Sequence, residues 1–268
     1  MARELSRNRS PALGFHVLFI AFVMAPLVAV CLTAFTPENY LTMPQGSLSL
    51  RWFRTLLHRS DFLRAAWLSV RLAAAAATLA VVIATPATLA FAHHRFIGRD
   101  ALIALFMSPL TIPHVVLGIA LLRYFTQFGL GATFTGLVFG HVLLVMPFAL
   151  RLILASAVGM DERIQQAAVS LGAGPFDTLR RIVLPLIAPG VASGWILAFI
   201  VSFDEVAMTV FLVTPGTETL PIRMLNHIQE TTDPLVAAVS AILIAGTALL
   251  ALLLDRLYGL DRLLAGHK

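Results

Sequence analysis

Charge is scarce in this chain of 268 residues, because only 12% of them are Asp, Glu, Lys or Arg. An ordinary soluble domain is about 25% charged and about 45–50% apolar. Here 59% of the residues are hydrophobic. A water-soluble globule needs more charged surface than this, and a disordered chain needs fewer apolar residues. The composition therefore excludes both and leaves a polytopic membrane protein.

Lysine and cysteine are almost absent. Lys268 is the one lysine, so the first 267 residues hold no lysine for a Walker A phosphate-binding loop. If ATP drives this protein, another polypeptide must bind it. Cys31 is the one cysteine, which excludes a disulfide within the chain. We expect no cofactor and no metal on this chain.

Six stretches are apolar enough, at roughly 20 residues each, to span a membrane as helices. The predicted fold is therefore an all-α polytopic membrane protein with six transmembrane helices in one domain, residues 1–268. Arg3, Arg7 and Arg9 precede the first stretch, which is longer than the core of a signal peptide and is interpreted as an uncleaved anchor. The six stretches have approximate bounds of 14–35, 65–92, 101–124, 134–157, 186–213 and 234–254.

The basic residues predict which side each connection faces. With both termini inside, twelve of the 19 Lys and Arg residues fall on the inner side and six on the outer side. Arg71 lies within the second stretch and is left unassigned. Because inner loops are enriched in Lys and Arg, we expect both termini in the cytoplasm.

The outer segment, residues 36–64, contains a predicted short helix. Phe53, Leu56 and Leu57 recur there with Arg51 and Arg54 close by. Apolar side chains at this spacing among cationic ones are typical of a helix lying at the membrane interface.

The inner segment, residues 158–185, reads as two short helices. Asp161 can cap the first helix, and Gly172 suits the left-handed position after its end. Pro175 suits the first turn of the second helix. The apolar faces are Ile164, Ala167, Ala168 and Leu171 on the first helix, and Phe176, Leu179, Ile182 and Val183 on the second. An exposed apolar turn of this kind is expected to bury itself in a partner.

This inner segment resembles the EAA loop of permease subunits of bacterial type I ABC importers. That loop reads E-A-A, three residues, G, nine residues, I, one residue, L-P. This chain has Gln166-Ala167-Ala168, Gly172, Ile182, Leu184 and Pro185 at the same spacing. Gln166 replaces the usual glutamate, so an ion pair with the ATPase at that position is in doubt, while docking itself is not.

The resemblance implies a coupling loop between helices four and five that docks on a cytoplasmic ATP-binding subunit. It also implies a bacterial inner membrane location, a second permease chain, two ATP-binding subunits that hold ATP and Mg²⁺, and an external substrate-binding protein. The residues that it assigns to ATPase coupling are Gln166, Ala167, Ala168, Gly172, Ala173, Phe176, Ile182, Leu184 and Pro185.

Three further short motifs resemble the spermidine and putrescine branch of these importers. They are Trp52-Phe53, the run 202–205 and the run 214–216. This resemblance implies a permease for polyamines. The open alternatives within the class are another organic cation, an aminophosphonate, a metal chelate or an oxyanion.

Asp204 and Glu205 lie inside the fifth apolar stretch, about 14 Å from its outer end. A charge at such a depth costs on the order of 3 kcal/mol, so it is either functional or paired. The functional hypothesis is a cation site with Asp204, Glu205 and Ser202, walled by Phe203 and Trp195 through cation–π contacts. The alternatives are an ion pair with Arg71 or Arg123, a hydrogen-bonded contact with another helix, and simple packing of Trp195.

Other polar residues of the apolar stretches are interpreted as structural. His114 and His141 have no metal-ligand spacing and are expected to hydrogen-bond or pack. A proton-coupled secondary transporter is a rival class, but it calls for a broken helix and inverted repeats, and the sequence suggests neither. An intramembrane enzyme would need a nucleophile or metal cluster that we do not find.

Overall fold

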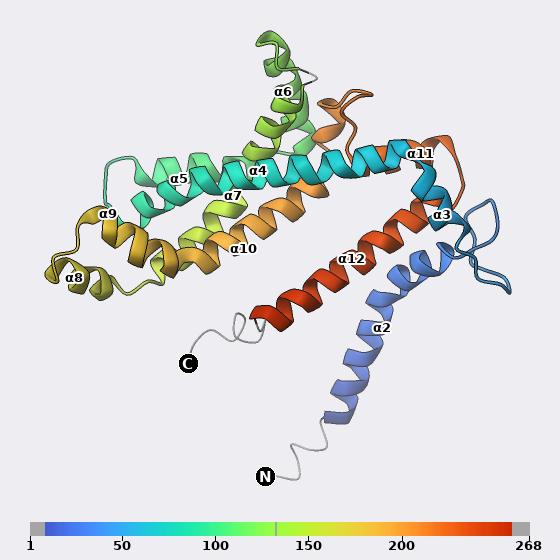
Figure 1. The fold of residues 1–268 in the computed structure, drawn as a ribbon, viewed down its shortest axis with the longest axis horizontal. Coiled ribbons are helices and arrows are strands. Elements are labelled where there is room, and N and C mark those ends of the chain that lie inside the picture. The colour runs from blue at the N-terminus through green and yellow to red at the C-terminus, as the bar shows by residue number, and fades with distance from the viewer. Residues whose placement is uncertain (1–8, 132, 259–268) are drawn as a thin grey trace. The chain divides into compact units, whose positions relative to one another are not determined.

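The computed structural model describes residues 9–131 and 133–258, and every regular element in these ranges is a helix (Figure 1). This confirms the all-α class. The chain divides into two compact parts, which we treat separately. The first part combines the residues up to 63 with those from 224 onward, and the second part is residues 64–223.

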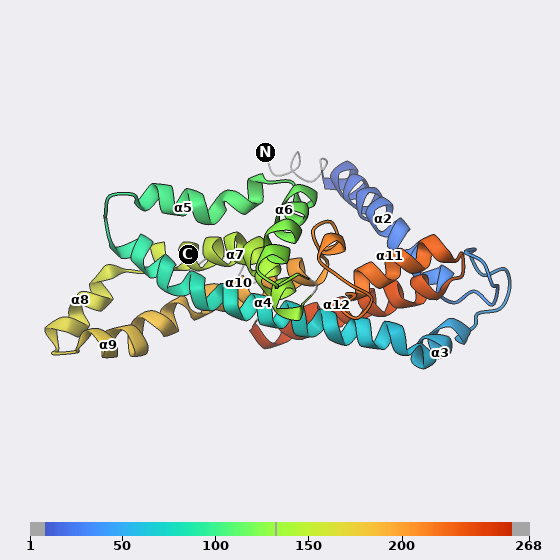
Figure 2. The same ribbon diagram turned by 90° about the horizontal axis from the view of Figure 1, so that it is seen from above.

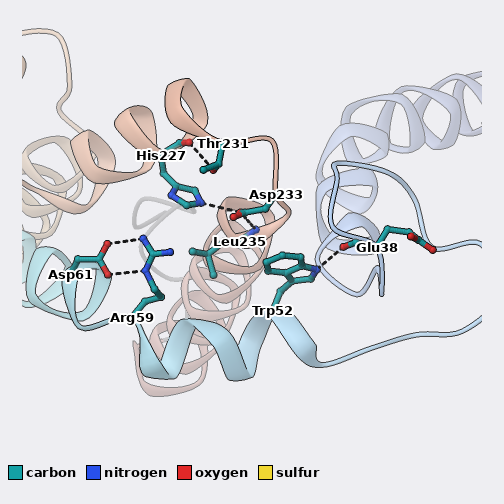
Figure 3. Close-up of polar contacts among 8 residues, drawn as sticks. All are labelled: Glu38, Trp52, Arg59, Asp61, His227, Thr231, Asp233 and Leu235. Carbon is teal, nitrogen blue, oxygen red and sulfur yellow. Dashed lines mark hydrogen bonds and ion pairs between the residues drawn. The ribbon is translucent and has the colours of Figure 1, made fainter.

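The first part contains α2 (Arg9–Thr33), α3 (Arg51–His58), the end of α11 (Leu220–Glu230) and α12 (Leu235–Tyr258). Helix α12 packs against both α2 and α3. Polar contacts fix the connections between these helices (Figure 3). The indole nitrogen of Trp52 donates to the Glu38 carbonyl at 3.2 Å, and Arg59 donates twice to the Asp61 carboxylate, at 3.0 and 2.8 Å.

Asp233 organises the start of α12 in the same close-up (Figure 3). One carboxylate oxygen of Asp233 accepts from the Leu235 backbone N–H at 3.0 Å, which satisfies one of the free donors at the helix start. The same oxygen lies 2.9 Å from Nε2 of His227, a buried side chain of α11. One aspartate thus joins the end of α11 to the beginning of α12.

Helix α3 confirms the predicted short helix in the outer segment. The buried side chains are Trp52 and Leu56, and Phe53 contacts Phe35 with ring centroids 5.0 Å apart. Leu57 is exposed. Trp52, one turn before Leu56, packs in the interior beside it, and the interfacial position of the helix stays a prediction.

The second part contains most of α4 (Ser60–His93), then α5 (Arg99–Met107), η1 (Ser108–Thr111), α6 (His114–Gln127) and α7 (Phe134–Val158). These are followed by α8 (Glu162–Ser170), α9 (Pro175–Thr178), η2 (Leu179–Val183), α10 (Leu184–Phe203) and η3 (Thr209–Phe211). Its core joins buried residues of α4, α7 and α10, among them Ala80, Val145 and Ala198.

Small residues let α7 and α10 lie side by side (Figures 1 and 2). Gly190, Gly194 and Ala198 form a buried stripe at four-residue spacing on α10. A Cβ atom on Gly190 would overlap Ser156 of α7, and one on Gly194 would lie 3.3 Å from the Ala149 carbonyl oxygen. Without a hydrophobic force between helices in lipid, such close backbone approach is the main source of their association.

Four helical segments are long and apolar enough to cross a membrane: Leu13–Thr33, Ser60–His93, Phe134–Val158 and Pro175–Phe203. The bent pair Arg99–Thr111 and His114–Gln127 makes a fifth if it counts as one span. In α12 the apolar section found by the same criterion is Leu235–Leu249, which is shorter. The count of six transmembrane helices therefore stays a prediction.

The third apolar stretch is a broken helix, which the sequence analysis did not expect. The chain turns by 105° between η1 and α6, at Ile112 and Pro113 (Figure 1). Pro113 has no N–H to continue the helix, and it holds the preceding residue in an extended conformation. The prediction that no helix is broken is therefore wrong, and it no longer counts against a secondary transporter.

The fifth apolar stretch was predicted to be helical from 186 to 213, and this is also wrong at its end. Helix α10 ends at Phe203, and the chain then runs through an irregular segment that includes η3. We call residues 204–212 the post-α10 segment. Several side chains that the prediction placed on a helix, including Asp204 and Glu205, lie in this segment.

Some predictions concern residues outside the described ranges. Arg3, Arg7, Arg262 and Lys268 contributed to the charge bias, and they lie outside the described residues, as do the two chain ends.

Candidate functional site

The inner segment folds as predicted, as two short helices joined by a glycine turn; we call residues 161–178 the knuckle. The Asp161 side chain caps α8 by accepting from the Arg163 backbone N–H at 2.9 Å. Pro175 occupies the first turn of α9, where its missing N–H has no helical partner to lose. The knuckle lies at one end of the second part, beyond the end of α4 (Figures 1 and 2).

Gly172 closes α8 in a left-handed conformation, with φ of 87°. Its N–H donates to the Val169 carbonyl at 2.9 Å, and the Ala173 N–H donates to the Ala168 carbonyl at 3.0 Å. This pair of bonds is a Schellman motif, which favours glycine because a Cβ atom strains this φ. No heavy atom lies within 4 Å of the position that a Cβ would take, so the demand for glycine comes from the backbone alone.

A single π-helical turn, η2, connects α9 to α10. The Leu184 N–H donates to the Leu179 carbonyl, five residues back. Pro185 follows directly, and in a regular α-helix its ring would clash with the Arg181 carbonyl. The wider turn relieves this clash, so the second half of the predicted coupling loop continues into α10 without a break.

The nine residues assigned to ATPase coupling differ in exposure. Those that face solvent are Gln166, Ala167, Gly172, Phe176, Leu184 and Pro185. Ala168 is buried, and Ala173 and Ile182 are half-buried. Leu171 and Phe176 protrude most, with 89% and 71% of their surface exposed. The knuckle therefore presents an apolar tip, as expected, and packs Ala168 and Ala173 on its inner side.

A histidine spans the break after α10. Nδ1 of His141, on α7, lies 2.8 Å from the Ser202 hydroxyl, and Nε2 lies 3.1 Å from the Thr209 hydroxyl. His141, Ser202 and Thr209 are all buried. This confirms hydrogen bonding as the role expected of His141, and it fixes both ends of the turn that follows α10.

Glu205 is buried at 6% exposure and has two partners. One carboxylate oxygen accepts from the Met208 backbone N–H at 2.7 Å, and the other lies 2.9 Å from Nδ1 of His114. The suggested pairing with Arg71 or Arg123 is wrong: the partner of Glu205 is His114, and Arg71 lies over the Phe134 ring at 5.3 Å. Sequence reasoning missed this pair, although a carboxylate in an apolar stretch needs a partner and His114 is a polar residue of another such stretch.

Asp204 is in a different environment, although it is the adjacent residue. It caps the C-terminal end of α10 and is exposed. Within the described residues its carboxylate has no hydrogen bond or ion pair. Of the five residues suggested for a substrate pathway, Asp204 is therefore the one with a free charge.

The aromatic candidates form a stack along α10. Trp195 and Phe199 lie with ring centroids 5.4 Å apart, and Phe199 and Phe203 with centroids 6.1 Å apart. The Trp195 indole also donates to the Thr78 hydroxyl of α4 at 3.0 Å. Trp195 thus anchors α10 to α4, and the stack leads along α10 to Phe203, next to Asp204.

The post-α10 segment packs closely against α6. A Cβ atom on Gly118 of α6 would lie 2.8 Å from the Met208 carbonyl oxygen and 2.8 Å from the Phe211 ring. Together with the His114–Glu205 and His141 contacts, this packing holds the segment on two sides.

No group of three or more His, Cys, Asp or Glu side chains suited to a metal ion occurs in the described part of the chain. Apolar helices long enough to cross a membrane, a bent pair of helices and a buried polar turn are compatible with a membrane-embedded transport subunit. The family model described as "Binding-protein-dependent transport system inner membrane component" matches residues 80–260. The chain belongs to this family, whose members are permease subunits and not enzymes.

Several proteins are similar to this chain over most of its length. The spermidine/putrescine transport system permease protein PotC of Escherichia coli K12 is 30% identical over 86% of this chain and 87% of its own. The putrescine permease PotI of the same strain is 28% identical over 87% and 85%. The putative 2-aminoethylphosphonate permease PhnV of Salmonella paratyphi A is 28% identical over 90% and 91%.

A solved structure shares the fold. It is a bacterial alginate ABC transporter in complex with an alginate-bound periplasmic protein, with a TM-score of 0.69 and 16% identity over 95% of this chain and 96% of that chain. Together with the family match, this sets aside the secondary transporter and the intramembrane enzyme as alternatives.

Proposed function

We propose that this chain is one of two permease subunits of an ATP-driven importer for polyamine-like organic cations. The observation that carries the substrate class is the free carboxylate of Asp204 at the C-terminal end of α10. Because that end of a helix carries partial negative charge, the carboxylate and the helix dipole attract the same kind of ligand. That ligand is an ammonium group.

The similar proteins support this class without fixing the molecule. PotC and PotI are described as permeases for spermidine or putrescine, and PhnV for 2-aminoethylphosphonate. All three compounds carry an ammonium group. The phosphonate also carries negative charge, which Asp204 would repel, so polyamines fit the site better.

Coupling to ATP hydrolysis is assigned to the knuckle. Its apolar tip, Leu171 and Phe176, would enter a groove on an ATP-binding subunit, and Gln166 would donate or accept a hydrogen bond beside it. Two such subunits would bind ATP and Mg²⁺, and this chain would bind neither. A second permease, related to this chain but different from it, would complete the pathway.

The knuckle and the turn between α4 and α5 lie at the same end of the second part, because Gln165 of α8 contacts His93 at the end of α4. The arginines at this end include Arg95, Arg99, Arg163, Arg180 and Arg181. Such a cluster favours the cytoplasmic side. This supports the proposed cytoplasmic position of the knuckle and of the chain ends.

The test is uptake by proteoliposomes that contain the complete importer, including its own substrate-binding protein. Labelled spermidine, putrescine and 2-aminoethylphosphonate are compared at equal concentration, with and without ATP inside. We expect ATP-dependent uptake of at least one polyamine and little of the phosphonate. Uptake of the phosphonate alone would overturn the substrate class but leave the permease role intact.

A further inference from the structure

Helix α8 touches the membrane-spanning helices through a side-chain bridge. The Gln165 side-chain nitrogen lies 2.9 Å from Nε2 of His93, at the end of α4. Nδ1 of His93 lies 3.1 Å from the Leu89 carbonyl oxygen, which can only accept, so Nδ1 carries the hydrogen. Nε2 therefore accepts the hydrogen bond that the Gln165 amide donates.

This bridge lies at an open pocket between α4 and the inner segment, and both His93 and Gln165 line that pocket. A cavity of about 590 Å³ separates the end of α4 from the knuckle, with Pro86 and Leu89 on one side and Val169 and Ala173 on the other. Close-packed side chains transmit displacement, but an open cavity does not. A directional hydrogen bond at this pocket can define the position of α8 relative to α4.

Helix α4 continues from this bridge to contacts with α10 and α11. Its Thr78 hydroxyl accepts from Trp195 of α10, and its Ser69 hydroxyl accepts from the Leu220 N–H at 2.7 Å. Ser69 and His93 are 24 positions apart, so α4 spans about 36 Å between these contacts. Helix α4 thus contacts the knuckle through His93, α10 through Thr78 and the start of α11 through Ser69, and it contains Pro86 between His93 and Thr78.

Two adjacent glutamines of α8 face in different directions. Gln166 is exposed and belongs to the residues assigned to docking, whereas Gln165 is half-buried against His93. His94, next to His93, is also exposed. Gln166 and His94 therefore serve as comparison positions, because each is the same residue type as its neighbour in the bridge but takes no part in the hydrogen bond.

We propose that the His93–Gln165 hydrogen bond transmits movement of the knuckle to α4, so that His93 and Gln165 are positioning residues for transport. This inference rests on the proposed coupling function of the knuckle. Without this hydrogen bond, α8 can still dock on the ATP-binding subunit, but its position relative to α4 is no longer fixed. ATP hydrolysis then continues, while fewer cycles move substrate.

The experiment measures substrate uptake per ATP hydrolysed by the complete importer in proteoliposomes, at equal amounts of inserted permease. His93→Ala and Gln165→Ala should each lower this ratio about fivefold, the factor expected for one lost hydrogen bond. The double variant should lose no more than either single variant, because both remove the same bond. His93→Gln, which keeps an acceptor near the Nε2 position, should restore most of the ratio.

The controls separate this inference from the docking function. His94→Ala should leave the ratio unchanged, and the ATP-binding subunit should co-purify normally with the His93 and Gln165 variants. Gln166→Ala should instead weaken co-purification. An unchanged ratio in both single variants, or an additive loss in the double variant, would overturn the transmission role. Normal co-purification of Gln166→Ala and of Phe176→Ala would overturn the docking function instead.

Discussion

The Glu205 carboxylate lies 2.9 Å from Nδ1 of His114, so a pair of polar side chains joins the two places where apolar helices break. His114 begins α6, directly after the 105° bend, and Glu205 follows the end of α10. Each break exposes backbone and side-chain polar groups that a continuous helix would have hidden. His114 at one break and Glu205 at the other are polar partners, which explains why both breaks are tolerated in an apolar bundle.

We expect Glu205→Ala to destabilise the subunit. The substitution removes the acceptor of the Met208 N–H and leaves His114 without its partner, which should lower the free energy of unfolding by about 1–3 kcal/mol. Glu205→Gln can keep both contacts and should be much milder. Thermal unfolding of the detergent-purified protein measures the difference.

Asp177→Ala is the control for this stability measurement. Asp177 forms an exposed pair with Arg181 at 3.1 Å, which should contribute little. Equal melting temperatures for Glu205→Ala and Asp177→Ala would mean that the Glu205–His114 pair has no structural role.

The conformation of Gly172 gives a second prediction. Gly172→Val should strain the left-handed turn by about 1–2 kcal/mol, distort the knuckle and reduce co-purification of the ATP-binding subunit, while membrane insertion stays normal. Gly172→Asn should retain more binding, because asparagine tolerates this region better than valine does.

Gly174→Ala provides the comparison for Gly172. Gly174 has an ordinary φ of −70° and open space around its Cβ position, so alanine should be harmless there. If Gly172→Val bound the ATP-binding subunit as well as the unaltered protein does, the knuckle would have no role in docking.

Orientation in the membrane can be measured by cysteine labelling, because Cys31 is the one native cysteine and can be replaced by serine. Ser47 and Ser170 are both exposed, and the proposed topology puts them on opposite sides of the membrane. Ser47→Cys should react with an impermeant maleimide in intact cells. Ser170→Cys should react only after permeabilisation, and the opposite pattern would invert the orientation.

Local sequence rules predicted the knuckle well. The cap at Asp161, the left-handed Gly172 and the start at Pro175 depend on residues within one or two turns, so their positions follow from the sequence. Helical class and most apolar segments also follow from composition. The exposure of Leu171 and Phe176 was expected as well, because the two helices are too short to bury both faces.

Long-range contacts determine the features of the fold that local sequence patterns did not predict. A window of average hydropathy cannot detect that α10 ends at Phe203, because the residues after it are still mostly apolar. The end depends on His141, which bridges Ser202 and Thr209 from another helix. The His93–Gln165 bridge joins positions 72 residues apart, and no local pattern marks it.

The most direct test of the proposed import function is polyamine uptake by Asp204→Asn in the complete importer, measured beside the amount of inserted protein. Asparagine keeps the volume of the side chain but removes the charge, so insertion should be normal and uptake should fall about tenfold. Asp100→Asn, which removes an exposed charge from the start of α5, should transport normally. Full uptake by Asp204→Asn at a normal protein level would contradict the cation site and the substrate class that depends on it.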